Sequence, residues 1–276
     1  MKTRNIFTLS VLIMFGILFS VGCSDSATDP VKETGTILLK LTDAPFPIDL
    51  ATRAEVTIDQ ISIKSQGDVE ADSLLILSSV TATYNLLDLR NGITETLLEM
   101  NIPAGIYHQI RLRVVDAEIE LTDGQIFNLN IPSGIQTGIK INVHPFLQIA
   151  GGTTNEILLD FDLEKSFVMR GNRNNITGFN FKPVIRAVNN SDAGTILGYV
   201  KSYADSALAN ARVWVEADSV ISTTFCDENG EYTIIGIPTG TYSVHATTEG
   251  FDTASVAGVV LDAGEFERQN FNLNQL

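Results

Sequence analysis

Strand-like alternation dominates the hydrophobic pattern of this chain. Between residues 106 and 114, apolar side chains and one histidine alternate with polar or aromatic ones. Between residues 157 and 163, apolar side chains alternate with a set that includes Asp160 and Asp162. Such alternation is typical of antiparallel strands that bury one face and leave the other in water.

Other stretches support the same class. The apolar positions of residues 56–63 alternate with one phase slip, which predicts a β-bulge. Gly, Pro, Asn and Asp separate the runs at short intervals, as turns do. Only Ile93–Met100 has a pattern that fits two helical turns. We therefore expect an all-β protein of two antiparallel β-sandwich domains in tandem.

The domain boundaries follow from composition. A polar, turn-prone linker at residues 189–193 separates a first block, residues 35–188, from a second, residues 194–276. Each block has an ordinary domain size. A polar, short segment at residues 23–34 precedes the first block and has the composition of a flexible tether.

The N-terminus has the features of an export signal, residues 1–22. Two cations are followed by the mostly apolar run Ile6–Phe19, which is shorter than the roughly 20 residues that span a membrane. Ser20–Cys23 resembles a bacterial lipobox, although leucine is usual at the position of Ser20. The resemblance implies lipidation of Cys23 and, because Ser24 follows it, an outer-membrane location. An uncleaved anchor or a plain signal peptide are the alternatives.

The charge of the chain excludes some partners. There are 18 Lys and Arg against 33 Asp and Glu, a net charge of −15. Nucleic-acid binding, which draws most of its affinity from phosphate neutralisation, is therefore not expected. The acidic balance favours cationic partners or calcium. If Cys23 carries lipid, Cys226 has no partner for a disulfide, and we expect a buried thiol.

One phrase occurs in both blocks. Ile102–Tyr107 and Ile237–Tyr242 both read Ile-Pro-x-Gly-x-Tyr. Pro and Gly form a tight turn, and the Tyr then opens the next strand. In β-sandwiches a Tyr at such a position often ties its hydroxyl to nearby backbone.

The second block resembles the carboxypeptidase regulatory-like domain, a prealbumin-like β-sandwich. The residues that carry the resemblance are Gly198–Val200, Ala211–Val215, Asp227–Tyr232, Ile237–Tyr242 and Gly250–Phe251. The resemblance implies a rigid module or spacer of a secreted or surface protein. The wider fold group includes starch-binding domains, but a fold alone does not identify a ligand.

The first block resembles the bacterial family known as domain of unknown function 4382. The residues that carry the resemblance are Leu41–Pro45, Leu86–Leu89, Gly92, Pro103–Gly105, Tyr107, Gln109–Leu112, Pro132–Gly134, Gly138–Lys140, Asp160–Asp162, Lys182–Pro183 and Arg186. The resemblance implies an extracytoplasmic β-domain of the lipoprotein type. It carries no functional residues over.

Asp160 and Asp162 are the sharpest candidate site. Two positions apart on a strand, their carboxylates point the same way. With Asp43 or Asp88 from a neighbouring loop they would supply several of the oxygens that calcium needs. Alternatively, they pair with cations or face water; the candidate cations are Arg111, Lys140, Lys182 and Arg186. A glycosidase-type carboxylate pair is a further alternative.

The remaining candidates have structural explanations. Asp227–Gly230 fits a hairpin turn in which Asp caps backbone amides better than a calcium loop. His108, in phase with the apolar residues at 106 and 110, is placed on the core face, and no histidine has a second one at ligand spacing. Trp214, Tyr199 and Tyr203 are candidates for a glycan platform, with a packed domain junction as the alternative for Trp214.

Five tripeptides fit an Asp-Ser/Thr-aliphatic O-glycan acceptor pattern of Bacteroidetes-type bacteria. They begin at Asp25, Asp72, Asp205, Asp218 and Asp252. The hypothesis that some carry glycans is tested by the intact mass of the native protein, because an unmodified mass contradicts it.

The expected function is that of a non-catalytic binding or structural module on the bacterial outer membrane. Its expected partners are the membrane, through the lipid, and a glycan or an envelope protein. No cofactor is expected apart from the calcium of the carboxylate hypothesis. Calcium-dependent adhesion, an envelope-assembly role and a carboxylate-based hydrolase are the alternatives.

Overall fold

The computed structural model describes residues 33–44, 50–66, 74–131, 137–173 and 175–276. These residues belong to one compact unit. The expected export signal and Cys23 lie outside the described residues.

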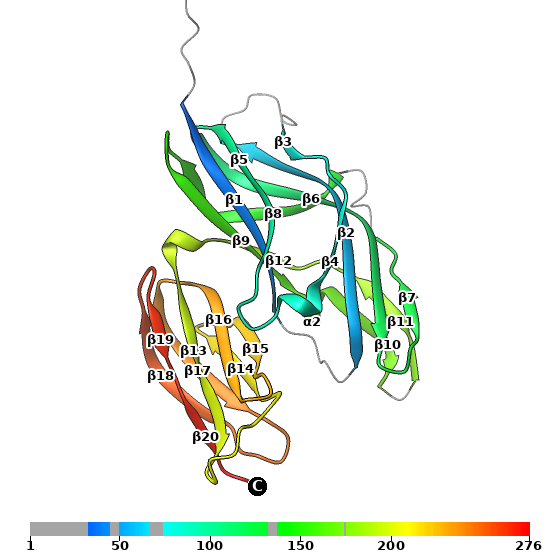
Figure 1. Ribbon diagram of the computed structural model, residues 1–276, viewed down its shortest axis with the longest axis vertical. Helices are drawn as coiled ribbons and strands as arrows, with labels where there is room; N and C mark the ends of the chain where they lie inside the picture. Colours follow the sequence, from blue (N-terminus) through cyan, green and yellow to red (C-terminus); the bar gives the residue numbers. More distant parts are fainter. Residues whose placement is uncertain (1–32, 45–49, 67–73, 132–136, 174) are drawn as a thin grey trace, which may run out of the picture. The chain divides into compact units, whose positions relative to one another are not determined.

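The first domain is built almost entirely from strands (Figure 1). Its strands are β1 (Thr34–Ala44), β2 (Ala51–Ser65), β3 (Leu75–Ser78), β4 (Ala82–Asn85), β5 (Glu95–Pro103), β6 (Gly105–Leu121), β7 (Ile126–Asn128), β8 (Ile139–Ile149), β9 (Thr154–Asp162), β10 (Phe167–Asn172), β11 (Asn175–Phe181) and β12 (Ile185–Asn189). A 3₁₀ turn, η1 (Leu86–Leu89), follows β4, and the short helix α2 (Leu163–Ser166) follows β9.

Ten of these strands form one sheet in the order β3-β2-β6-β8-β12-β9-β1-β5, with β4 also on β2 and β7 on β6. Most pairs are antiparallel, whereas β1 with β9 and β8 with β12 are parallel. The β8–β12 connection is a single bridge between Val143 and Ala187. Apolar side chains from both sides of this connection form one buried cluster, so the sheet closes into a sandwich.

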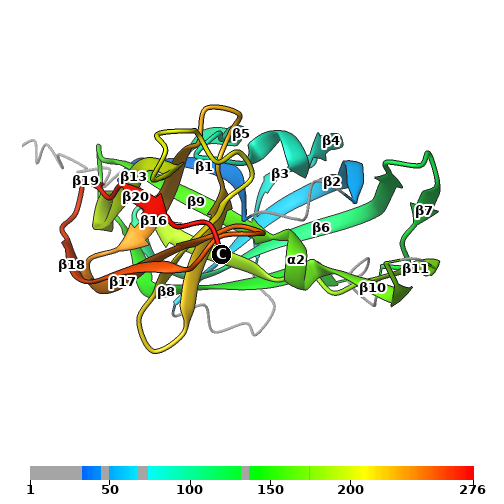
Figure 2. The ribbon, with the colours of Figure 1, turned by 90° about the horizontal axis from the view of Figure 1, so that it is seen from below.

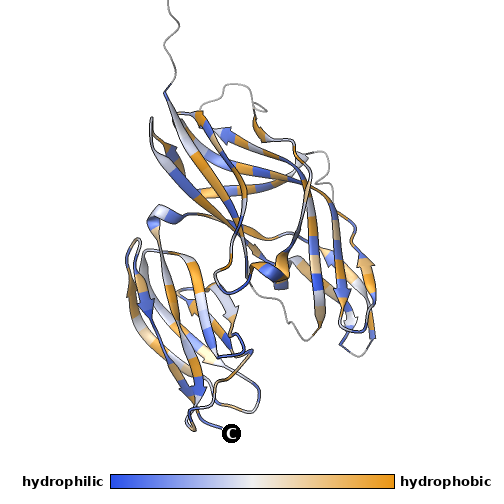
Figure 3. Cartoon of the chain, in the orientation of Figure 1, coloured by the Kyte–Doolittle hydropathy of each residue, from blue (hydrophilic) through white to orange (hydrophobic). Residues whose placement is uncertain are grey.

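The alternation of apolar and polar side chains along these strands is visible in Figure 3. In β2 the ladder with β6 shifts between Thr57 and Ile58 and again before Gln60, which confirms the predicted bulge. The separate hairpin β10–β11 reaches β7 (Figure 2), where the rings of Phe127 and Phe179 meet edge to face at 5.7 Å.

The second domain follows β12 through the three-residue turn η2 (Asn190–Asp192). Its strands are β13 (Ala193–Ser202), β14 (Arg212–Glu216), β15 (Val220–Phe225), β16 (Glu231–Pro238), β17 (Gly240–Thr247), β18 (Ala254–Leu261), β19 (Phe266–Arg268) and β20 (Phe271–Leu273). One sheet has the order β16-β13-β19 with β20 also on β13, and the other β15-β14-β17-β18. Their inner faces share one core. The predicted fold class, two β-sandwiches in tandem, is confirmed.

The repeated Ile-Pro-x-Gly-x-Tyr phrase makes the same contact twice. The hydroxyl of Tyr107 donates to the Pro103 carbonyl, and that of Tyr242 donates to the Pro238 carbonyl, each at 2.7 Å. Each bond closes the turn between two consecutive strands, β5 and β6 or β16 and β17, that do not pair with each other. The predicted tie between Tyr hydroxyl and backbone is confirmed in both domains.

Removing one of these hydroxyls has a defined cost. We expect Tyr242→Phe to lower the free energy of unfolding by about 1 kcal/mol, because the Pro238 carbonyl loses its side-chain donor. Urea unfolding followed by fluorescence measures this. Tyr203→Phe is the control, because the Tyr203 side chain is 70% exposed. Equal midpoints for the two variants would contradict the prediction.

Two local predictions are wrong. Ile93–Met100, expected to make helical turns, lies mostly in β5, because its side chains pair along β1. The core face of β6 is as expected from Ile110 to Val114, but the beginning of the strand has the opposite phase. Tyr107 and Ile110 are buried and Ile106 is exposed, because the ladder with β8 slips between Tyr107 and Gln109.

Candidate functional site

The acidic pair lies at the C-terminal end of β9, and each member already has a cation. Asp160 accepts from Arg186 of β12 at 2.7 Å and is buried. Asp162 begins helix α2: it accepts the Lys165 amide at 3.0 Å and pairs with the Lys165 ammonium at 2.8 Å. Of the cations expected to pair with these carboxylates, Arg186 does so.

Asp43 does not join this pair. It lies on β1 in register with Phe161, and paired residues of parallel strands share a face. Thr42, not Asp43, is the partner of Asp160 in this ladder, although Asp43 and Asp160 both line one small pocket. Among the described residues, no group of three His, Cys, Asp or Glu is arranged to hold a metal ion. The structure thus lends the calcium hypothesis for Asp160, Asp162 and Asp43 no support.

The Asp43 carboxyl is itself unusual. It is 7% exposed, and neither oxygen has a hydrogen-bond partner among the described residues that meets normal geometry. Burial raises the pKa of this carboxyl well above its ordinary value, and the negative charge of Asp160 raises it further. A carboxyl in such surroundings favours its neutral form.

Arg186 links the two domains. Besides Asp160, its guanidinium donates to the Gly236 carbonyl of β16 at 3.0 Å. Gly236 has a φ of +66°, and a Cβ there would approach Leu158 Cδ2 to 2.7 Å. Glycine is therefore required both by the backbone conformation and by the close approach of the first domain. The same contact explains why Leu158 is buried although it alternates with core residues of β9.

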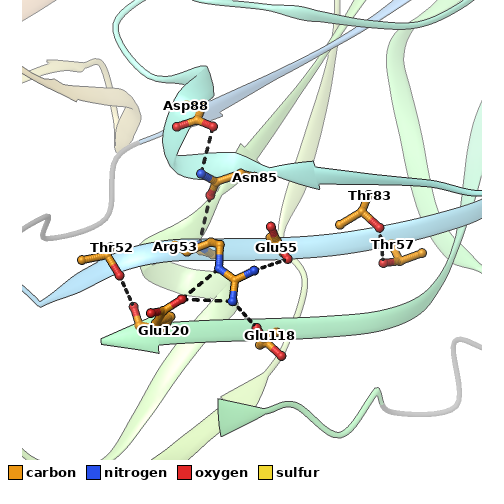
Figure 4. A network of polar contacts seen from close by, with 10 residues as sticks. Thr52, Arg53, Glu55, Thr57, Thr83, Asn85, Asp88, Glu118 and Glu120 are labelled. Carbon is orange, nitrogen blue, oxygen red and sulfur yellow. Dashed lines mark hydrogen bonds and ion pairs between the residues drawn. The ribbon is translucent and has the colours of Figure 1, made fainter. Parts of the chain in front are cut away.

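A second link runs through the loop after η1. Asn91 accepts from the Thr233 amide and donates to the Glu231 carbonyl of β16. Its side-chain amide thus occupies backbone positions at the open edge of that strand, as a neighbouring strand would. Asn85 positions this loop from the other side, because its side chain joins the Ala54 amide to Asp88 (Figure 4).

A groove of about 640 Å³ adjoins this link. It is lined by Leu87, Asp88, Arg90, Asn91 and Ile93 on one side and by Ala209, Asn210 and Phe225–Glu228 on the other. Its size is that of a small-molecule site. One of its acidic side chains already has hydrogen-bond donors within the protein. Asp227 accepts hydrogen bonds from the backbone amides of Asn229 and Glu231, at 2.9 and 2.8 Å. The predicted turn, with Asp as its cap, is confirmed.

Two family models match the chain in the order of these domains. Residues 34–183 match the domain of unknown function DUF4382, and residues 195–274 match the carboxypeptidase regulatory-like domain. The first match covers more than half of the chain. The chain belongs to the DUF4382 family. The two parts are called the DUF4382 domain and the regulatory-like domain below.

Solved structures share only a distant likeness with the chain. The Bacillus anthracis TIE protein matches with a TM-score of 0.26 and 13% identity over 88% of this chain, which spans 34% of that protein. BcpA, the major pilin subunit of Bacillus cereus, matches with a TM-score of 0.25 and 10% identity. This match covers 88% of this chain and 71% of BcpA. The shaft pilin SpaA of Lactobacillus rhamnosus GG matches with a TM-score of 0.23 and 12% identity. This match covers 88% of this chain and 97% of SpaA. At these TM-scores the likeness carries no argument about function. No curated protein matches the chain.

The aromatic candidates of the regulatory-like domain do not form one platform. Trp214 lies on β14, half-buried, with its ring stacked on His245 at 4.8 Å and under the Arg212 guanidinium. Tyr199 lies on β13, in the other sheet, beneath the Lys201 ammonium. Tyr203 is exposed. Arg212 also approaches Glu164 of the DUF4382 domain, at 3.8 Å, so that part of the expected junction lies beside Trp214.

The nucleophile candidates are weak. Cys226 is a free, buried thiol as predicted, and burial raises its pKa to about 12. His245 Nδ1 lies 2.7 Å from the Ser255 hydroxyl, while its Nε2 is 3.6 Å from Glu216. This contact was not foreseen, because the three residues come from three strands. The imidazole stacks on Trp214 and lines none of the described pockets.

Among the described residues, no helix is long and apolar enough to cross a membrane.

Proposed function

We propose that the chain is a lipoprotein of the bacterial outer membrane, anchored through Cys23, whose two domains form a non-catalytic binding or structural module. The lipobox-like Ser20–Cys23 after an apolar run supports the anchor. Two or more acyl chains on one cysteine attach a protein stably to a membrane, whereas a single chain binds only weakly.

One observation carries the module part of the proposal. The two sandwiches are joined by directed polar contacts, Arg186 to Gly236 and Asn91 to Thr233, rather than by a flexible linker. The connecting turn η2 is three residues long. Such a junction holds the DUF4382 domain on a fixed support, which suits a protein that presents a surface.

The chemistry of the described residues supports a non-catalytic role. Asp160 and Asp162 are held by cations, and the Cys226 thiol is buried with a raised pKa. A hydrolase would need a nucleophile or an acid and a base that face a cleft. Cys226 lines the groove described above, but its raised pKa keeps the thiol protonated at neutral pH, and among the described residues no histidine lines that groove to act as its base.

Metabolic labelling tests the anchor. We expect palmitate to label the full chain, and the protein to fractionate with the outer membrane. Cys23→Ala should lose the label and leave the membrane fraction. Cys226→Ala is the matched control, because its buried thiol is not an acylation site. Label that persists in Cys23→Ala would overturn the proposed anchor.

A further inference from the structure

The outer face of β6 is divided by charge. Towards the C-terminal end, Arg53 of β2 pairs with Glu55, Glu118 and Glu120 at 2.7–3.1 Å (Figure 4). Towards the N-terminal end, the same face carries Arg111 and no carboxylate pairs with it among the described residues. The acidic chain thus has a basic area on its first domain.

Arg111 stands directly opposite Lys140 of β8 in the antiparallel ladder. Like charges at such a position repel and destabilise the sheet. The Arg111 side chain donates through Nε to Gln109 at 2.8 Å, an uncharged acceptor, and no ion pair of Lys140 exists within the described part of the chain. An anion bound between the two cations would remove this repulsion.

A pocket of about 250 Å³ opens at Arg111. Its lining residues are Gln60, Ser62, Leu74, Arg111, Arg113, Thr137 and Gly138. Asp59 already holds Arg113 through two bonds of 2.6 and 2.9 Å, which leaves Arg111 as the cation available to a ligand. The pocket is smaller than a typical small-molecule site, so it fits one unit of a longer ligand.

The neighbouring side chains suit a sugar. The Gln60 amide lines the pocket and offers both donors and an acceptor, and Asn142, whose Oδ1 accepts from Gln109 at 3.0 Å, keeps its amide donors. Ser62 also lines the pocket but is only 4% exposed. Further along β8, Phe146 is 47% exposed and packs edge to face on His108 at 6.4 Å. An exposed ring held in place by a second ring presents a flat apolar surface beside the polar one.

We propose that the outer face of β2, β6 and β8 binds an acidic polysaccharide, with Arg111 and Lys140 holding a sugar carboxylate and Phe146 supporting a neighbouring ring. Guanidinium recognises carboxylate through two parallel bonds, which sets the carboxylated sugar apart from a neutral one. The proposal gives the proposed module its ligand class, and it rests on that function; the labelling of Cys23 tests the anchor independently.

Binding to oligogalacturonate, by calorimetry with a soluble chain that begins at Ser24, tests the proposal. We expect binding that is lost with the methyl-esterified oligomer, which has the same sugars without the charge. The double variant Arg111→Gln with Lys140→Gln should weaken binding by about tenfold or more, because it lacks both charged donors. Phe146→Ala should weaken binding without altering its dependence on salt.

The matched control is the pair Lys182→Gln and Arg268→Gln, which removes the same charge from exposed positions elsewhere. It should bind as the parent does. The proposal is overturned if oligogalacturonate does not bind, if polyglutamate binds equally well, or if the control pair weakens binding as much. It is also overturned if Arg111 and Lys140 are needed only for binding to phosphatidylglycerol vesicles, or only for self-association in gel filtration.

Discussion

Replacing Arg186 with methionine is expected to lower the free energy of unfolding by about 3 kcal/mol. The change leaves Asp160 buried without its cation and removes the donor to the Gly236 carbonyl. Breaking a buried ion pair from one side is strongly destabilising, because the remaining charge has no water to solvate it. Arg186 is 29% exposed, so the figure lies at the lower end of the range for such pairs.

A double variant separates charge from packing. Asp160→Leu combined with Arg186→Met should recover most of the loss, because apolar side chains of similar volume replace both charges. Urea unfolding at neutral pH measures all three proteins, and Lys182→Met is the control at an exposed position of the same region. If the double variant is no more stable than Arg186→Met alone, the buried charge is not the cause.

Asp43→Asn is expected to stabilise the protein at neutral pH by about 1–3 kcal/mol, because the raised pKa of Asp43 disfavours the folded parent at this pH by about 1.4 kcal/mol for each pH unit of the rise. The amide has nearly the shape of the carboxyl but cannot ionise. The parent must either ionise Asp43 in a buried position or keep its proton.

The effect depends on pH in a defined direction. The pKa of Asp43 is raised in the folded state, so the folded chain holds the proton more tightly than the unfolded chain does. Asp43 makes its full contribution to the free energy of unfolding below about pH 4, the ordinary pKa of a carboxyl group. This contribution falls as the pH rises through the pKa that Asp43 has in the folded state. Asp43→Asn should remove this fall, whereas the exposed Asp218→Asn should not. The midpoints of urea unfolding, measured from pH 4 to 8, test this prediction. If Asp43→Asn is less stable than the parent at pH 7, the buried carboxyl does not destabilise the parent.

The strands and turns of this chain were predictable because they depend on local chemistry. Alternation identified β6 and β9, and the Pro-Gly-Tyr phrase identified both hydroxyl contacts. The phase of His108 was not predictable, since it depends on a slip in the β6–β8 ladder. Opposite β2 the extra residue lies in β6 itself, at His108, where the sequence continues to alternate as though no bulge were present.

The same limit applies to the sites. Asp43 has the residue type of a calcium ligand, but it is in register with Phe161 rather than with Asp160, and no group of three such ligands forms among the described residues. Conversely, Arg111 and Lys140 are 29 positions apart and have no shared motif, and only strand pairing makes them neighbours. The hydrogen bond between Asn91 and β16 forms only because the two domains dock there. The pattern of the sequence contains no signal for that docking.

The position of β1 has a mechanical consequence. This strand follows the proposed tether directly and is hydrogen-bonded on both sides, to β5 and to β9. Because the bonds of both ladders run across the strand, a pull on its N-terminal end loads them in shear, all together. A terminal strand at a sheet edge would instead peel off one bond at a time. The first strand of the DUF4382 domain is therefore placed to carry tension between the proposed membrane anchor and the proposed ligand.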